Sequence, residues 1–182
     1  MKQQNMTNTR NLALDGMLTA ILVVLGMIKI PSLIPGAEFQ LSAPYAVCVA
    51  ALVGFGRYLG IGICASIIQL LLGNHTILNV LIAMVFRIVV GVIVSVLPKS
   101  RAALYVAGPC GTAVARIVLG AVLHTSPWPL LAAALPGMIF TAVVVIMMTP
   151  VVKRVAVLCG LAVPASMVKM SGAQLDADML KE

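Results

Sequence analysis

Charged side chains are scarce in this sequence. They make up 9% of the 182 residues, whereas hydrophobic residues make up 62% and the mean hydropathy is +1.12. Soluble domains carry roughly a quarter of their residues as charges. The shortage therefore excludes a soluble globular domain, and we expect the apolar surface to face lipid.

Acidic residues, aromatic residues and catalytic motifs are also few or missing. Five Asp and Glu stand against twelve Lys and Arg, and aromatic residues amount to 4%. The net charge of +7 does not indicate nucleic-acid binding, because most basic residues flank hydrophobic runs, as membrane topology signals do. The sequence holds no Ser/His/Asp set, no zinc-protease motif and no phosphate-binding loop, so we expect neither an enzyme nor direct use of ATP.

The cysteines show no metal-binding pattern. All four lie in or near apolar runs, without a CxxC pair or a histidine at ligand spacing: Cys48, Cys64, Cys110 and Cys159. We therefore expect packed or lipid-facing cysteines, and neither a metal nor a cofactor.

Hydrophobic runs are what the sequence has in abundance, and they predict an all-α integral membrane protein with a six-helix transmembrane bundle. A membrane-crossing helix needs about 20 apolar residues. Proline, glycine and charged residues between the runs mark the helix ends. The predicted spans are Leu12–Ile30, Ala43–Phe55, Tyr58–Gly73, Thr76–Leu97, Ala102–His124 and Leu130–Val152. The second and third are short for a full crossing.

The distribution of lysine and arginine predicts that both termini are cytoplasmic, because basic residues concentrate on the cytoplasmic side of membrane proteins. With the N-terminus inside, only Lys29 falls in an outer segment. The cytoplasmic segments hold Lys2, Arg10, Arg57, Lys99, Arg101, Lys153, Arg154, Lys169 and Lys181. This topology gives a cytoplasmic segment at 1–11, a membrane domain at 12–152 and a cytoplasmic tail at 153–182.

Two arginines lie deep within predicted spans. Arg87 is near the middle of the fourth span, and Arg116 is in the outer half of the fifth. A charge at the bilayer centre costs at least about 2.5–3.5 kcal/mol, and the only acidic residue in any span, Asp15, lies at the start of the first. The arginines therefore indicate a polar cavity that binds an anionic group. The alternative is bonding to backbone carbonyls or polar side chains of neighbouring helices.

Intervals of four residues place further side chains on the faces of these arginines. The two sets are Asn79, Ala83 and Arg87 in the fourth span, and Arg116, Gly120 and His124 in the fifth. Because the two helices run antiparallel, we expect Asn79 and His124 at the same outer level. The faces then line one cavity that opens outward, unless the small residues serve only close helix packing.

The segment Pro31–Ser42 between the first two spans is long for a helix hairpin. Its polar residues Glu38 and Gln40 lie next to the predicted cavity. The segment is therefore either a lid over the cavity or an ordinary solvated loop.

Small residues gather on one side of the first span, at Ala13, Gly16 and Ala20. Gly16 and Ala20 are four positions apart, a spacing that lets another helix approach closely in lipid. This pattern predicts an interface with a partner helix.

These features together resemble the substrate-binding S component of energy-coupling factor (ECF) vitamin transporters. The resemblance covers about residues 8–155 and rests on the chain length, the six spans with short second and third helices, and the small face of the first helix. The segment from Ile34 to Pro44 is similar to the family's first outer loop. The family motif on the first helix is an alanine pair four residues apart, and Gly16 replaces its first member.

The resemblance implies a high-affinity binding subunit for uptake of a small anionic vitamin or micronutrient across the bacterial plasma membrane. The implied partners are a transmembrane coupling (T) component, contacted through the first helix, and two ABC-type ATPase subunits. The implied site uses the first outer loop and the outer halves of helices four to six. These regions hold Glu38, Gln40, Asn79, Arg87, Arg116 and His124.

Two other functions remain open. One is a structural or assembly protein of a cell-envelope complex, without a ligand. The other is a self-sufficient secondary transporter, which is disfavoured because the spans show neither an inverted repeat nor an acidic proton relay.

Overall fold

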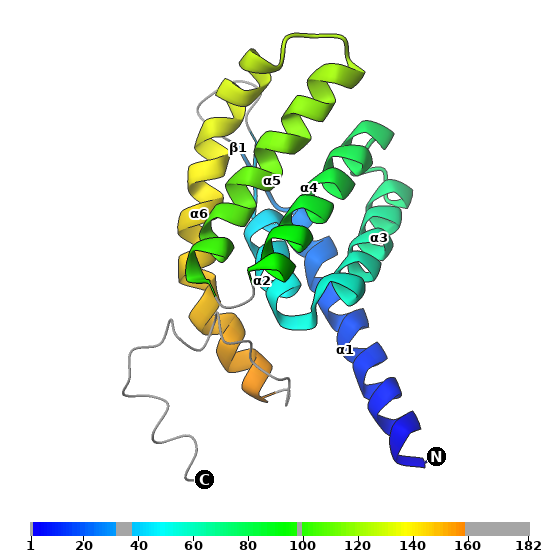
Figure 1. Cartoon of the computed structure of the whole chain (residues 1–182). Helices are drawn as coiled ribbons and strands as arrows, with labels where there is room; N and C mark the ends of the chain where they lie inside the picture. Colours follow the sequence, from blue (N-terminus) through cyan, green and yellow to red (C-terminus); the bar gives the residue numbers. More distant parts are fainter. Residues whose placement is uncertain (1, 32–37, 98–99, 159–182) are drawn as a thin grey trace.

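The computed structural model describes residues 2–31, 38–97 and 100–158. These residues form six helices and one short β-hairpin between the first two helices (Figure 1). The helices are α1 (Lys2–Met27), α2 (Ser42–Val53), α3 (Phe55–Leu71), α4 (Ile77–Val96), α5 (Arg101–Val122) and α6 (Pro127–Leu158). The predicted helical fold and its number of helices are confirmed for this part of the chain.

Four of the helices are long and apolar enough to cross a membrane, so the chain is a membrane protein. They are α1, α4, α5 and α6. The other two are apolar but shorter, with 12 residues in α2 and 17 in α3. At 1.5 Å per residue, α2 reaches only about 18 Å, less than the roughly 30 Å of a hydrocarbon layer. The prediction that the second and third helices are short is confirmed.

Helix α1 differs from the predicted span at both ends. It begins at Lys2 and ends at Met27, and the residues after it form strand β1 (Lys29–Pro31). Helix α6 likewise continues to Leu158, beyond the predicted end at Val152. The polar segment before Leu12 is thus helical, because hydropathy marks the lipid-embedded part of a helix and not its full length.

The predicted loop between the first two spans is partly a β-hairpin. Strand β1 pairs antiparallel with β2 (Glu38–Gln40), with Lys29 opposite Gln40 and Pro31 opposite Glu38. Residues 32–37 of the expected lid lie outside the described residues. The hairpin fixes where the chain enters α2, and it brings Gln40 to the start of that helix.

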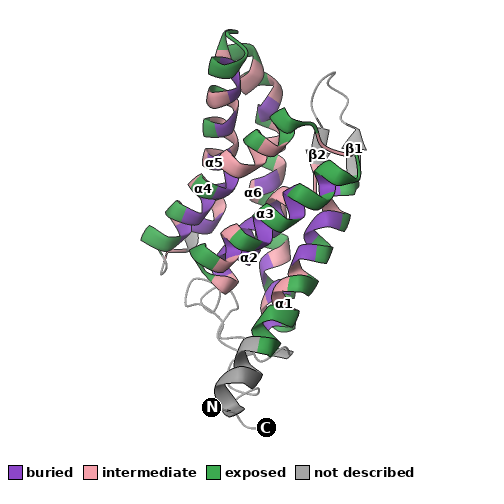
Figure 2. Ribbon diagram, turned by 90° about the vertical axis from the view of Figure 1, so that its right-hand side faces the viewer, coloured by how far each residue is buried: buried purple, intermediate pink, exposed green. Residues whose placement is uncertain are grey.

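Helix α2 occupies the centre of the bundle. All residues from Pro44 to Ala51 are buried, and the helix packs against each of the other five helices. The buried residues accordingly run through the middle of the molecule (Figure 2). A helix that is apolar on all sides is expected at such a position. The other helices each keep exposed hydrophobic side chains, as a lipid-facing bundle requires.

An ion pair joins α1 to α3. Arg57 Nη2 lies 2.6 Å from Asp15 Oδ1, and Arg57 Nε donates to Asp15 Oδ2 at 3.1 Å. Arg57 Nη2 also donates to the backbone oxygen of Asn11 at 3.3 Å. Asp15 is therefore the partner of Arg57, so it does not compensate the two arginines deeper in the bundle.

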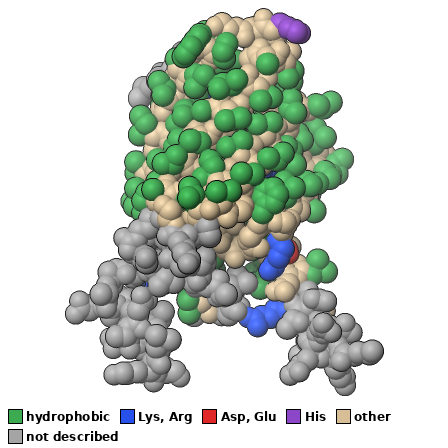
Figure 3. All heavy atoms as spheres, viewed as in Figure 1, with side chains coloured by type: hydrophobic (Ala, Val, Ile, Leu, Met, Phe, Trp, Pro, Cys, Tyr) green, Lys and Arg blue, Asp and Glu red, His purple; other side chains and the backbone are tan. Residues whose placement is uncertain are grey.

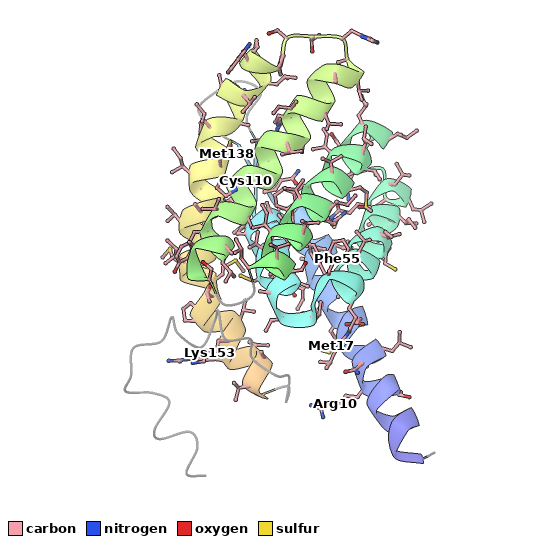
Figure 4. The ribbon with its side chains drawn as sticks, viewed as in Figure 1. Arg10, Met17, Phe55, Cys110, Met138 and Lys153 are labelled. Carbon is pink, nitrogen blue, oxygen red and sulfur yellow. The ribbon has the colours of Figure 1, made fainter. Side chains whose placement is uncertain are left out.

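Basic side chains gather at one end of the molecule. The start of α1 and the end of α6 lie at this end, where Figure 4 shows Arg10 and Lys153. On the face seen in Figure 3, hydrophobic side chains cover the body of the bundle, and Lys and Arg lie near the same end. The predicted topology places this end on the cytoplasmic side, and that orientation stays a prediction.

This orientation predicts the accessibility of two serines. Ser100 precedes α5 at the basic end of the predicted topology, and Ser126 is exposed in the turn before α6. In intact cells expressing a variant without the native cysteines, we expect Ser126→Cys to react with an impermeant thiol reagent. Ser100→Cys should stay unlabelled until the cells are opened. The reverse pattern would place the N-terminus outside.

Candidate ligand cavity

A cavity of about 410 Å³ lies inside the bundle, and its walls come from β2 and all six helices. Small-molecule sites typically have volumes of about 300–1,000 Å³, so the cavity has the size for one vitamin-sized molecule. Several residues of the lining, alanines and Gly137, have small side chains or none, which leaves room for a ligand. The polar side chains in the lining are Gln40, Ser42, Gln69, His75, Asn79, Arg87, Thr112, Arg116 and Thr141.

Four of the six predicted site residues line this cavity. They are Gln40, Asn79, Arg87 and Arg116. Helix α4 begins with a cap in which the backbone nitrogen of Asn79 donates to Thr76 Oγ1 at 3.4 Å. The α-helical period then turns Asn79 and Arg87 to the same side. A role for these residues in ligand binding remains a prediction.

The structure does not bring His124 to the cavity. Helix α5 ends at Val122, and His124 follows in the left-handed region with φ of 50°. Its side chain is exposed instead of continuing the face of Arg116. Gly120, the middle member of that face, packs against the backbone of the next turn, where a Cβ atom would lie 3.2 Å from Pro127 Cα. The periodic pattern failed here because the helix ends before His124.

Glu38 is placed only by its backbone, in β2, and its side chain lies outside the described residues. His75 lies in the turn before α4 and contributes to the lining.

Arg87 is held by α3. Its side chain is only 8% exposed, and its Nη1 donates to Ser66 Oγ at 2.5 Å and contacts Met84 Sδ at 3.8 Å. Its alkyl part passes over Gly62, where a Cβ atom would lie 2.3 Å from Arg87 Cδ. In the described part of the chain both contacts come from Nη1, so Nε and Nη2 keep donors for a ligand.

Arg116 is half-buried and makes no hydrogen bond or ion pair to any described residue. It lies nearer to the α5–α6 turn than Arg87 does. Phe86, the neighbour of Arg87 in α4, packs against Gly111 of α5, where a Cβ atom would lie 2.9 Å from Phe86 Cδ2. Arg116 follows Gly111 by five positions of helix, which corresponds to about 7.5 Å along the axis. The two arginines therefore lie at different depths of one cavity.

The charge of the lining is positive. The residues that line the cavity in the described segments include two arginines and no carboxylate. In these segments no group of three His, Cys, Asp or Glu side chains is suited to a metal ion. Since burial away from water strengthens electrostatic attraction, the cavity is suited to an anionic molecule.

Sequence reasoning missed several lining residues. Thr112 precedes Arg116 by four positions, so the periodicity used for α5 already predicts it on the same face. Gln69 is the only amide side chain within α3. The mean hydropathy of the helix hides this single polar residue. Phe86 and Phe140 are apolar, so a search for polar residues within the spans does not find them. Only the tertiary structure shows that they line the cavity.

The sequence has a clear relative among curated proteins. Over 136 residues, which are 75% of this chain and 82% of the relative, it is 52% identical to Protein BioX of Lysinibacillus sphaericus. No family model matches the chain, and no solved structure matches it. Identity at this level over most of both chains shows common descent, and the chain therefore belongs to the family of Protein BioX.

Proposed function

We propose that this protein is the membrane-embedded binding subunit of an uptake system and that its cavity holds a small anionic vitamin or micronutrient. The observation that carries the proposal is the pair Arg87 and Arg116 in one cavity of a lipid-facing bundle. Placing charges there is costly, and charged residues within membrane bundles commonly mark substrate sites. Arg116 in particular has no described partner that would explain its position.

A separate complex energises the uptake in this proposal. The chain has no phosphate-binding loop of its own. Ala13, Gly16 and Ala20 are all exposed on α1, and nothing lies within 4 Å of a Cβ atom built at Gly16. This small face is open for a helix of a transmembrane coupling component, which in turn binds two ABC-type ATPase subunits in the bacterial plasma membrane.

Biotin is the first ligand to test, because the relative is named Protein BioX. Biotin carries one carboxylate, which suits a guanidinium partner. The proposal itself requires only a small anion.

Two measurements address the ligand and the partners. We expect native mass spectrometry of the purified protein to show a retained small anion, and we expect pull-down from a native membrane extract to recover ATPase subunits. The variant Gly16→Leu with Ala20→Leu should keep the small molecule but lose the ATPases, because bulky side chains block close helix packing.

A control is Ala132→Leu, which makes the same change as Ala20→Leu at an exposed position of α6 outside the cavity lining. It should keep both the ligand and the ATPases. A protein without any bound anion would favour the structural or assembly role. Ligand uptake without any ATPase would favour a self-sufficient transporter. Unchanged assembly of the α1 variant would refute the interface.

A further inference from the structure

Gln69 is a buried polar residue at the junction of the cavity and α1. Its side chain is 4% exposed and lines the cavity. Its Nε2 donates to the backbone oxygen of Val23 at 3.2 Å. The contact is close, because a Cβ atom at Gly26 would lie 2.0 Å from Gln69 Nε2.

The hydrogen bond to α1 fixes the orientation of the amide. A backbone oxygen only accepts hydrogen bonds, so the nitrogen of the Gln69 amide must point to Val23 and Oε1 must point away. The backbone oxygen of Gln69 also accepts from the backbone nitrogens of Asn74 and His75 at 3.1 and 3.3 Å. Gln69 is thus held on two sides, and Oε1 accepts no hydrogen bond from any described residue.

Two threonines add acceptors to the same cavity. Thr112 Oγ1 donates to the backbone oxygen of Gly108 at 3.1 Å, and Thr141 Oγ1 donates to that of Gly137 at 2.8 Å. A hydroxyl has one proton, so both threonines have only lone pairs left. The lining therefore combines cationic donors from the arginines with neutral acceptors.

We propose that the ligand carries an N–H or O–H donor in addition to its anionic group, and that Gln69 Oε1 accepts a hydrogen bond from this donor. The inference rests on the proposed function and narrows the ligand class. A plain carboxylate with an alkyl chain that filled the cavity would offer the Gln69 oxygen no hydrogen-bond donor, which is unfavourable. Gln69 is then a specificity-determining residue, while the arginines supply the attraction for the anion.

The test uses two probes with the same carboxylate and rings: biotin and N,N′-dimethylbiotin, in which both ring N–H groups are methylated. Their dissociation constants are measured by calorimetry for the wild type, Gln69→Met and Thr149→Val. We expect the wild type to prefer biotin about tenfold, as one buried hydrogen bond predicts. Gln69→Met should reduce this preference to less than about twofold by weakening biotin alone.

Thr149→Val is the matched control. Thr149 is fully buried on α6, and its hydroxyl also donates to its own helix, to Val145 at 2.6 Å, but it does not line the cavity. It should keep the tenfold preference. A steric penalty of the methyl groups would persist in Gln69→Met, so it cannot imitate the expected result.

The outcomes separate the two proposals. Equal affinity of the wild type for both probes would overturn the donor requirement while leaving an anion site intact. This comparison needs no substitution, so it decides the question even if Gln69→Met fails to fold. An equal loss for both probes in Gln69→Met would make Gln69 merely structural. If neither probe binds the wild type, biotin is not the ligand, and the anion that native mass spectrometry finds in the purified protein decides: a retained anion without an N–H or O–H donor would overturn the inference, and one with such a donor would support it.

Discussion

Replacing Arg116 with alanine should weaken ligand binding about ten- to a hundredfold. A hydrogen bond to a charged group contributes about 1.5–3 kcal/mol, and each 1.4 kcal/mol is about a factor of ten in affinity. Arg116 has no described partner, so its removal leaves no buried group unpaired and should hardly change the melting temperature. Calorimetry of the purified variant measures the affinity, and thermal unfolding checks the fold.

Arg87→Ala should lose similar affinity but also stability, because Arg87 is buried and its Nη1 bonds to Ser66. At both positions lysine should give an intermediate affinity, since it keeps the charge but loses the planar fork. Arg154→Ala, an exposed position of α6, is the control and should bind like the wild type. Folded alanine variants that bind the ligand as tightly as the wild type would remove both arginines from the site.

The second large effect is expected at a glycine that does not line the cavity. In Gly62→Ala, the new methyl group would lie 2.3 Å from Cδ and 2.7 Å from Nε of Arg87. Because Arg87 is enclosed, the guanidinium must shift. We expect ligand affinity to fall nearly as far as in Arg87→Ala. Overpacking should also cost about 1–3 kcal/mol of stability. Both effects are measured by calorimetry and thermal unfolding.

Gly60→Ala provides the matched control on the same helix. Gly60 is exposed, and nothing lies within 4 Å of a Cβ atom built there. Alanine favours a helix over glycine by about 0.5–1 kcal/mol, so this variant should be as stable as the wild type or more stable, with unchanged affinity. If Gly62→Ala behaved like Gly60→Ala, the proposed role of Arg87 as a precisely positioned ligand contact would be refuted.

Features that depend on local pattern were predictable from the sequence. Hydropathy predicted the six helices and the two short ones, and the period of four in α4 correctly placed Asn79 and Arg87 together. The same rule failed for His124, because a helix end is decided by backbone conformation that periodicity does not report.

Features that depend on contacts between distant segments were not predictable. Asp15 pairs with Arg57 across 42 positions, and Arg87 bonds to Ser66 across 21. Gln69 bonds to Val23 across 46 positions. Hydropathy and periodicity describe only residues that are close in sequence. Contacts between distant residues therefore become visible only in the packing of the helices. The sequence therefore predicted which faces of the helices line the site, but it did not predict residues such as Ser66 that hold Arg87 in place.

The position of α2 also constrains how the protein is made. During synthesis this helix follows α1, yet every residue from Pro44 to Ala51 ends up enclosed by the other helices, including α6 near the end of the described chain. Until α6 has emerged from the ribosome, the wall that α6 provides for α2 is missing. A helix of about 18 Å is also poorly matched to the hydrocarbon layer by itself. The final placement of α2, and with it the cavity wall at Ala43 and Ala46, is thus a late event of biogenesis.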